Sequence, residues 1–382
     1  MALKVLMIVS WYSPKDAEVM TAGVFHYEQS MALQKYCETA LYYPFDTTLE
    51  TEFEKNSERG LLPYRRRMAS SRIPKLSAAA QTWHMLSDLR KICAEFKPDV
   101  LHAHCGLPAG SVVTLFGKLY GYPVVITEHS PIEHMALDRR SVKAQMHYAY
   151  HNSSANICVS GDSRNRLQAA FPDCRFQVVY NGILSPDVVE RDDQVYAKAG
   201  KCNCCIVAAF YSKDIKGYQY LLPAIAKLKG EGMEIVLHIC GGGDYLPYYM
   251  EMAKELGIQD SCVFYGSCSK EKAYSIVSQM DFSISASLYE CSGVSVEEAL
   301  LLGKPMLVTR SGGANSLVNE EVAVVVDRGS TDALADGIRE MRNRLATFNT
   351  DRIHAYAFEN FEIDQVSRRY MTIYEGLLES KK

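Results

Sequence analysis

The sequence predicts an α/β protein made of two similar domains, each with a parallel sheet and helical crossovers. Its 382 residues are enough for two to three domains of ordinary size. Short β-branched runs alternate with segments of helical periodicity, which is typical of parallel sheets. The alternation stops in a polar stretch at residues 181–203 and then starts again. We therefore expect a linker or hinge there, between the domains.

In the first domain, β-branched runs bounded by polar or turn residues predict strands. The runs are Val5–Val9, Leu41–Tyr43, Val100–His102, Val124–Thr127, Ile157–Val159 and Val178–Tyr180. Among the intervening helical segments, Trp83–Phe96 has the clearest pattern, because its apolar residues recur at steps of three and four. This stripe would cover the sheet.

The same alternation predicts the strands of the second domain, which are Cys205–Ala209, Ile235–Ile239, Val263–Tyr265, Phe282–Ser285, Met306–Thr309 and Val322–Val326. The last segment, Phe361–Leu378, has a helical pattern, and we expect it to pack back across the domains. The predicted boundaries are residues 1–184 for the first domain, 185–360 for the second and 361–382 for this terminal helix.

Composition excludes several classes of protein. The net charge of −4 gives no global positive field for nucleic acid. No apolar run reaches the roughly 20 residues of a membrane span, and no basic segment precedes the short apolar run Val5–Val9 as in a signal peptide. We expect a cytoplasmic protein with reduced cysteines. Cys202, Cys204 and Cys205 lack the paired spacing of a zinc site, so no metal is expected.

The segment 285–305 is the most informative in the chain. Gly303 and Pro305 predict the end of a helix that begins near Gly293, Val294 and Ser295. The N-terminus of such a helix, at the carboxyl end of a strand, favours anions. Glu290 lies in the preceding loop and Glu298 within the helix, so a bound diphosphate would have a carboxylate on either side. This arrangement suits a nucleotide sugar, whose hydroxyls can donate to both.

Glu290-x7-Glu298, followed by Gly303-x-Pro305, resembles the E-x7-E signature of the retaining glycosyltransferases of family 4. The resemblance implies the GT-B fold, in which two Rossmann-like domains face each other across a cleft. It also implies that Glu298 binds the ribose and that Glu290 contacts the donor sugar. The alternative is that Ser295 and Glu298 form a capping box and that Glu290 is a solvated acid.

Further elements of the second domain resemble the family in the same order along the chain. Lys216-Gly217 resembles its Lys-Gly element, whose lysine contacts the donor diphosphate. The family's usual arginine, shortly before that lysine, is Phe210 here, and Lys213 is the expected substitute. The Gly241–Gly243 turn resembles the nucleotide side of the family's site. Its base-binding position corresponds to Gly266.

The first domain carries matching elements. Gly23 resembles the family's N-terminal glycine loop, which approaches the donor phosphate and the acceptor. Asp99-x-x-His102-x-His104 and Thr127-x-His129 resemble two of its strand ends. The resemblance places His129 at the cleft, where it would orient the donor sugar, whereas we expect His102 to be structural.

The implied activity is transfer of a hexose with retention from a nucleotide-diphosphate sugar to a hydroxyl acceptor. The expected donor is a UDP- or GDP-sugar, and neither a metal nor another cofactor is expected. The predicted catalytic residues are His129, Glu290 and Lys216, and the predicted donor-binding residues are Gly23, Lys213, Gly243, Gly266, Gly293, Val294, Ser295 and Glu298. The family implies a role in the synthesis of cell-surface polysaccharide or glycolipid.

The acceptor side is predicted from a basic run in the first domain. Arg65, Arg66 and Arg67, followed by Arg72 and Lys75, would contact a saccharide or lipid-linked acceptor or the inner face of an anionic membrane. A solvated basic loop is an equal alternative.

Two other kinds of protein remain open as alternatives. One is a GT-B epimerase or phosphorylase, which would act without a second sugar acceptor. The other is a two-domain sugar-binding protein without enzymatic activity. A dehydrogenase is excluded because no G-x-G-x-x-G follows a strand.

Overall fold

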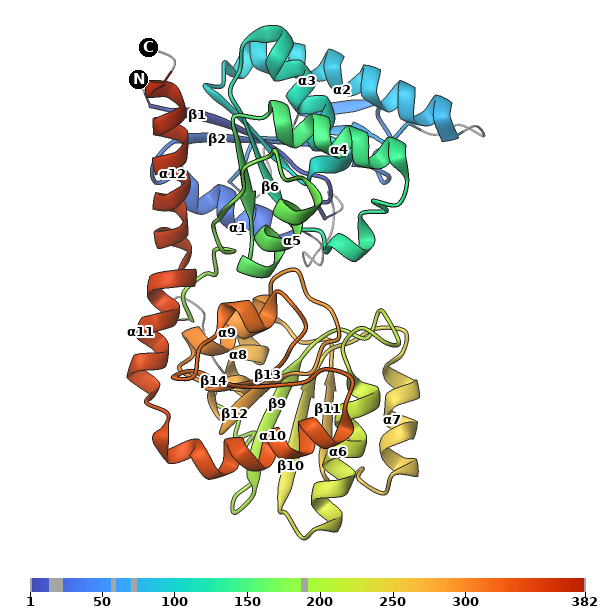
Figure 1. Cartoon of the computed structure of the whole chain (residues 1–382), viewed down its shortest axis with the longest axis vertical. Coiled ribbons are helices and arrows are strands. Elements are labelled where there is room, and N and C mark those ends of the chain that lie inside the picture. The colour runs from blue at the N-terminus through green and yellow to red at the C-terminus, as the bar shows by residue number, and fades with distance from the viewer. Residues whose placement is uncertain (1, 14–22, 56–59, 70–73, 187–191, 381–382) are drawn as a thin grey trace. The chain divides into compact units, whose positions relative to one another are not determined.

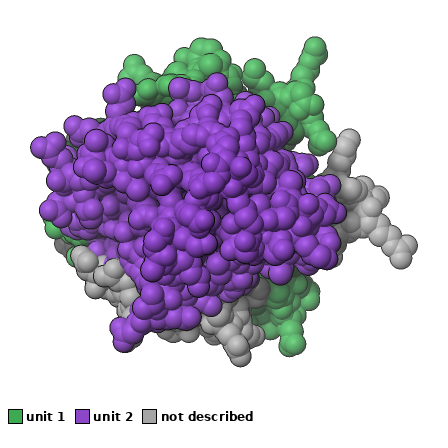
Figure 2. All heavy atoms as spheres, turned by 90° about the horizontal axis from the view of Figure 1, so that it is seen from below, with its two compact units in different colours: residues 1–182, 363–382 green, residues 183–362 purple. Residues whose placement is uncertain are grey.

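The computed structural model describes residues 2–13, 23–55, 60–69, 74–186 and 192–380, with the backbone alone at 74 and 75. The chain forms two compact units (Figure 2). Unit 1 consists of Met1–Gly182 and Ile363–Lys382, and unit 2 of Ile183–Glu362. Both units have a sheet flanked by helices (Figure 1), as the alternating pattern predicts.

Unit 1 contains an eight-stranded sheet in the order β3-β4-β2-β1-β5-β6-β7-β8. The strands are β1 (Lys4–Ile8), β2 (Glu38–Asp46), β3 (Phe53–Lys55), β4 (Pro63–Arg67), β5 (Val100–His104), β6 (Val124–Glu128), β7 (Ala155–Cys158) and β8 (Gln177–Val178). Each predicted strand of this half is present. All neighbouring pairs are parallel except β3 and β4, which are antiparallel.

The sequence analysis missed β3 and β4 because β4 consists largely of arginines. Arg65 is only 2% exposed, and its Nη1 donates to Asp46 Oδ2 at 2.7 Å. Arg66 is also buried and forms a two-pronged ion pair with Asp88 on the helix that covers the sheet. The predicted basic surface is therefore wrong for these two residues, since both are neutralised inside the unit.

Arg67 alone of the three arginines is exposed. Arg72 lies outside the described residues, as does the side chain of Lys75. The predicted acceptor or membrane face thus retains one described arginine.

The helices of unit 1 are α1 (Val24–Leu33), α2 (Pro74–Phe96), α3 (Ser111–Tyr120), α4 (Arg140–Asn152), α5 (Gly161–Ala170) and α12 (Ile363–Glu379), with short helical turns at Gly106–Gly110 and Ile132–His134. The apolar stripe on α2 packs into the core through Leu89 and Cys93. The α12 helix buries Val366, Tyr370 and Tyr374 against Val5 and Met7 of β1. The chain therefore returns to unit 1 at its end.

Unit 2 contains a parallel six-stranded sheet in the order β11-β10-β9-β12-β13-β14. The strands are β9 (Cys202–Val207), β10 (Ile235–Cys240), β11 (Cys262–Gly266), β12 (Phe282–Ser285), β13 (Met306–Thr309) and β14 (Ala323–Val326). The helices are α6 (Tyr218–Gly230), α7 (Leu246–Glu255), α8 (Lys270–Ser278), α9 (Val294–Leu301), α10 (Thr331–Arg344) and α11 (Thr350–Phe361), with helical turns at Ala314–Leu317 and Leu345–Thr347. All six predicted strands are present.

Each sheet has a point at which the order of its parallel strands reverses. In unit 2 it reverses between β9 and β12, and in unit 1 between β1 and β5. Ligands of open α/β sheets bind at such switch points, beyond the carboxyl ends of the strands. The loops after β9 and β12 carry Lys216 and Glu290, and the ends of β5 and β6 carry His104 and His129.

Among the described residues there is no disulfide. None of the described helices combines the length and apolarity needed to cross a bilayer.

Candidate functional site

The α9 helix begins where the sequence predicts it, with Gly293 at its N-cap and no side-chain cap. A capping box would need Ser295 at the N-cap, but Ser295 lies inside the helix, so that interpretation of Glu298 is wrong. The first turn of a helix carries N–H groups without intrahelical acceptors. Gly293, Val294 and Ser295 therefore form a helix N-terminus suited to a phosphate.

The structure brings Lys216 and Glu290 together. Lys216 Nζ donates to Glu290 Oε1 at 2.7 Å, and the same oxygen accepts from Ser287 Oγ at 2.7 Å. Both side chains remain partly exposed, at 30% for Lys216 and 21% for Glu290. A ligand can therefore reach the ammonium group.

Backbone contacts hold both loops in place. The backbone carbonyl of Glu290 accepts a hydrogen bond from the N–H of Gly313 at 2.8 Å, and Glu290 forms an isolated β-bridge with Gly312. Gly217 has φ +74°, and a Cβ there would lie 1.9 Å from the carbonyl oxygen of Ala286. Glycine is thus required at 217 to bring the Lys216 loop against the end of β12.

Glu298 lies in the middle of α9 with its side chain 18% exposed. Its Oε1 accepts from Tyr274 Oη at 3.3 Å and lies 3.8 Å from Lys270 Nζ. The carboxylate is therefore oriented by groups of α8 and is still accessible to a polar ligand.

The glycine turns after β10 and β11 lie side by side. Gly241 N donates to the carbonyl of Gly266 at 2.8 Å, and Gly266 has φ +69°. Gly243 has φ +137°, and a Cβ there would meet the backbone of Phe210 at 2.6 Å. The two turns predicted for the nucleotide side are thus neighbours, with one packed directly on the loop after β9.

Phe210 and Lys213 both lie against aromatic rings. Phe210 is fully buried and stacks on Tyr218 with ring centroids 4.2 Å apart, so it is a core residue where the family usually has arginine. Lys213 Nζ lies 4.5 Å from the ring centroid of Tyr248 on α7. Among the described residues, Lys216 is the lysine that pairs with Glu290.

Unit 1 places three histidines together at the ends of its strands. His104 Nδ1 and His129 Nε2 are 2.9 Å apart, and the two rings stack with centroids 5.2 Å apart. The His26 ring on α1 lies 4.4 Å from that of His104 and 5.4 Å from that of His129. Trp11 and Phe25 contact the His129 ring from two further directions.

Burial keeps these imidazoles neutral. It lowers the pKa of His129 to about 3 and holds the pKa values of His26 and His104 well below the ordinary range, with the neighbouring histidines adding to the effect on those two. A neutral imidazole offers one N–H donor and one acceptor, as binding of a sugar hydroxyl requires. His102 is structural as expected, because its two nitrogens contact Tyr374 Oη and Thr127 Oγ1.

Two residues of this site escaped the sequence analysis. Buried Glu128 accepts from the N–H groups of Gly106, His129 and Ser130 and from Tyr150 Oη, and so fixes the loop that carries His129. His26 follows the glycine loop by three positions. The Thr-Glu-His order at 127–129 and the short spacing from Gly23 to His26 were the available signals.

Gly23 is at the N-cap of α1 with φ +69°, and a Cβ there would lie 2.9 Å from the carbonyl oxygen of Trp11. This close approach requires glycine. It brings the end of β1 to the start of α1, beside His26.

Two clusters of the described residues have ligand atoms close enough for one metal ion. They are His26, His104 and His129, and His147, His151, Asp173 and Cys174. Cys202, Cys204 and Cys205 belong to neither.

Comparisons with known proteins agree with the geometry. The family model described as glycosyl transferases group 1 matches residues 189–344, and that described as glycosyltransferase family 4 matches residues 27–183. The α-monoglucosyldiacylglycerol synthase of Streptococcus pneumoniae is 24% identical over 294 residues, which are 71% of this chain and 66% of that protein. The chain spans about two thirds of the length of the first curated relatives it matches.

Solved structures show the same fold. Sucrose-phosphate synthase from Thermosynechococcus elongatus aligns with a TM-score of 0.80 at 15% identity, covering 99% of this chain and 100% of that one. Anabaena HepE in complex with UDP aligns with a TM-score of 0.73 at 17% identity, covering 98% and 100%.

The fold and the family models together define a glycosyltransferase with the GT-B fold. The chain belongs to glycosyltransferase family 4, because the family 4 model and the group 1 model between them match most of its length.

Proposed function

We propose that this protein transfers a hexose with retention from a nucleotide-diphosphate sugar to a hydroxyl acceptor, without a metal. The observation that carries the proposal is the ion pair between Lys216, on the loop after β9, and Glu290, on the loop that leads into the N-terminus of α9. One ammonium, a helix N-terminus and two flanking carboxylates match the charges and hydroxyls of such a donor.

The diphosphate is the leaving group, so negative charge develops on its bridging oxygen as the bond to the sugar breaks. Lys216 and the N–H groups at the start of α9 stabilise this charge electrostatically. Lys216 has three N–H donors and can keep its bond to Glu290 while it binds phosphate. In the proposal the acceptor attacks the same face of the sugar, and the departing phosphate oxygen takes the acceptor's proton.

The remaining polar groups have binding roles in the proposal. Glu298 accepts from the ribose hydroxyls, Glu290 from a sugar hydroxyl, and the Gly241–Gly243 and Gly266 turns receive the nucleotide. His129, held neutral by burial, hydrogen-bonds the donor sugar. The HepE structure contains UDP, which supports UDP as the nucleotide.

We further propose a saccharide or lipid-linked acceptor, in the synthesis of cell-surface polysaccharide or glycolipid. The glycolipid named in the S. pneumoniae relative supports this class. The proposal that the protein contacts the inner face of a membrane now depends on two features. One is the exposed Arg67, and the other is a set of large apolar side chains that face solvent: Met68, Leu76 and Trp83. Pelleting with anionic vesicles tests it, and absence of pelleting contradicts it.

Thermal melting tests the donor site before the acceptor is known. UDP, GDP, ADP and CMP are each added in excess to the wild type and to Glu298→Ala. A ligand at 100 times its Kd adds roughly 2.7 kcal/mol of stability. We expect one nucleotide to raise the melting temperature of the wild type and to do so much less in the variant.

The matched control is Glu251→Ala, because Glu251 is an exposed acid of α7 that forms an ion pair with Lys254 of the same helix. This control should respond like the wild type. A melting temperature unchanged by all four nucleotides would contradict the proposal.

A further inference from the structure

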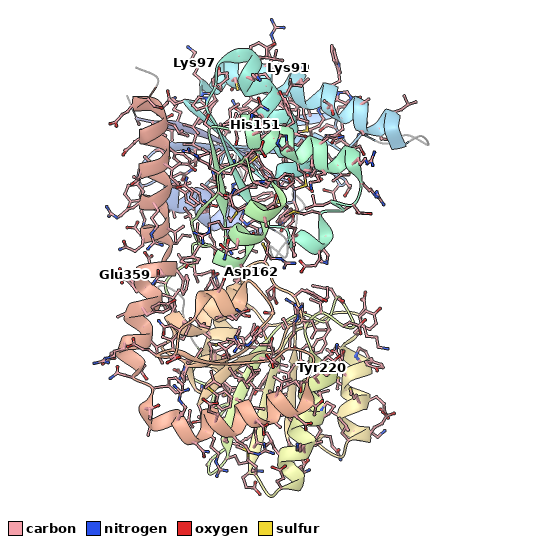
Figure 3. All side chains as sticks on the ribbon, viewed as in Figure 1. Lys91, Lys97, His151, Asp162, Tyr220 and Glu359 are labelled. Atoms are coloured by element: carbon pink, nitrogen blue, oxygen red, sulfur yellow. The ribbon has the colours of Figure 1, made fainter. Side chains whose placement is uncertain are left out.

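Two histidines lie one helical turn apart at the end of α4, in unit 1. His147 and His151 are four residues apart, so both rings project from one face of the helix. The rings stack with centroids 5.3 Å apart and an interplanar angle of 17°. Both side chains are about half exposed. Figure 3 labels His151 on this helix.

Asp173 and Cys174, from the turn after α5, meet these rings. Asp173 Oδ2 lies 2.7 Å from His147 Nε2 and 3.3 Å from His151 Nδ1. Cys174 is 3% exposed. One ligand atom from each of the four residues lies within 4.8 Å of the others.

These four residues supply two imidazole nitrogens, one carboxylate oxygen and one sulfur. Zinc binds this mixture of ligands tetrahedrally, with bonds of about 2.0–2.3 Å, so its ligand atoms lie roughly 3–4 Å apart. The observed separations need only small side-chain movements to reach that geometry. We propose that His147, His151, Asp173 and Cys174 form a binding site for a divalent transition-metal ion of the zinc class.

The backbone that carries the two loop ligands is already held in place. Cys174 N donates to the carbonyl of Phe171 at 3.1 Å, and Gln168 Nε2 donates to the carbonyl of Cys174 at 2.6 Å. Phe171 is buried and lies 6.3 Å from the ring of His147, centroid to centroid. Such surrounding contacts orient metal ligands before the ion binds.

A cavity of about 440 Å³ borders the site. His151, Asp173, Cys174 and Arg175 are among the residues that line it. The ion would therefore be reached from solvent, and an anionic ligand bound to it would lie beside a guanidinium. The site shares no residue with the His26, His104 and His129 cluster, and it does not depend on the proposed transferase activity.

Cobalt titration tests the proposal because Co²⁺ occupies zinc sites and reports its ligands by absorption. Reduced full-length protein without an affinity tag is titrated with Co²⁺. We expect one equivalent to produce the strong visible bands of a tetrahedral complex and a near-ultraviolet thiolate-to-cobalt band. Zn²⁺ should remove both.

Two variants test proposed ligands, and a third is the control. His147→Ala with His151→Ala should weaken Co²⁺ binding more than about 100-fold, a loss larger than the roughly 10–100-fold expected when only an outer contact is removed. Cys174→Ser should lose the thiolate band while retaining weaker binding. His134→Ala, which removes an exposed histidine outside the cluster, should leave the titration unchanged.

Thermal melting shows whether each variant is folded. The double variant should fold more reliably than Cys174→Ser, because His147 and His151 are exposed and Cys174 is buried. The proposal is overturned if wild-type protein shows no tetrahedral cobalt spectrum. It is also overturned if that spectrum survives in the folded double variant or is lost instead in His129→Ala, which would place the ion in the other cluster.

Discussion

The two units use polar side chains in opposite ways. Unit 1 buries them, as two arginine ion pairs behind β4 and as neutral imidazoles at the ends of β5 and β6. Unit 2 keeps Lys216, Glu290 and Glu298 partly exposed at its switch point. Buried pairs are costly to break, whereas exposed pairs contribute little to stability. Polar substitutions should therefore reduce stability in unit 1 and ligand binding in unit 2.

The largest effect is expected from Asp88→Ala. This change leaves the buried guanidinium of Arg66 without its carboxylate and removes the hydrogen bond from Tyr42 Oη. The free energy of unfolding should fall by about 3–5 kcal/mol, as measured by urea denaturation.

The matched control for that prediction is Asp332→Ala in unit 2, which removes the exposed partner of Lys227. It should leave the free energy of unfolding almost unchanged, because exposed ion pairs contribute little to stability. Similar losses in the two variants would remove the distinction between the units.

Acid should destabilise unit 1 next most strongly. Burial lowers the pKa of both His102 and His129 to about 3, so in the folded state they stay neutral below the ordinary pKa of 6.5. The unfolded chain binds more protons between those two pH values, so stability falls as the pH falls through that window. From pH 7 to 5 the loss is about 2 kcal/mol for buried His102, and less for the partly exposed His129.

Urea denaturation at both pH values measures this loss. His129→Gln should make the free energy of unfolding less dependent on pH. A pH dependence identical to that of the wild type would mean that the pKa of His129 is the same in the folded and the unfolded protein, so that burial does not lower it.

The two sheets, whose strands alternate with helices along the chain, were predictable because β-branched runs and helical periodicity reflect burial directly. The start of α9 was equally visible, because Gly303 and Pro305 end the helix and fix its length. The β4 strand was not, since Pro63–Arg67 has a charged sequence whose partners, Asp46 and Asp88, are distant in the chain.

Side-chain pairings were the least predictable part of the sites. Lys216 and Glu290 are 74 positions apart and meet because Gly217 lets the loop approach Ala286. His26 shares no strand with His104 or His129, so only the folded chain shows that it joins them. A local pattern carries no information on such long-range contacts.

Isothermal calorimetry of nucleotide binding to Lys216→Ala tests most directly whether unit 2 uses its exposed charges for the donor diphosphate. The titrant is the nucleotide diphosphate that raises the melting temperature, and Lys227→Ala removes a comparable exposed lysine of α6 as the control. We expect Lys216→Ala to bind about tenfold more weakly, a difference of about 1.4 kcal/mol, with almost unchanged stability, and the control to bind like the wild type. Equal affinity in wild type and Lys216→Ala would contradict the account.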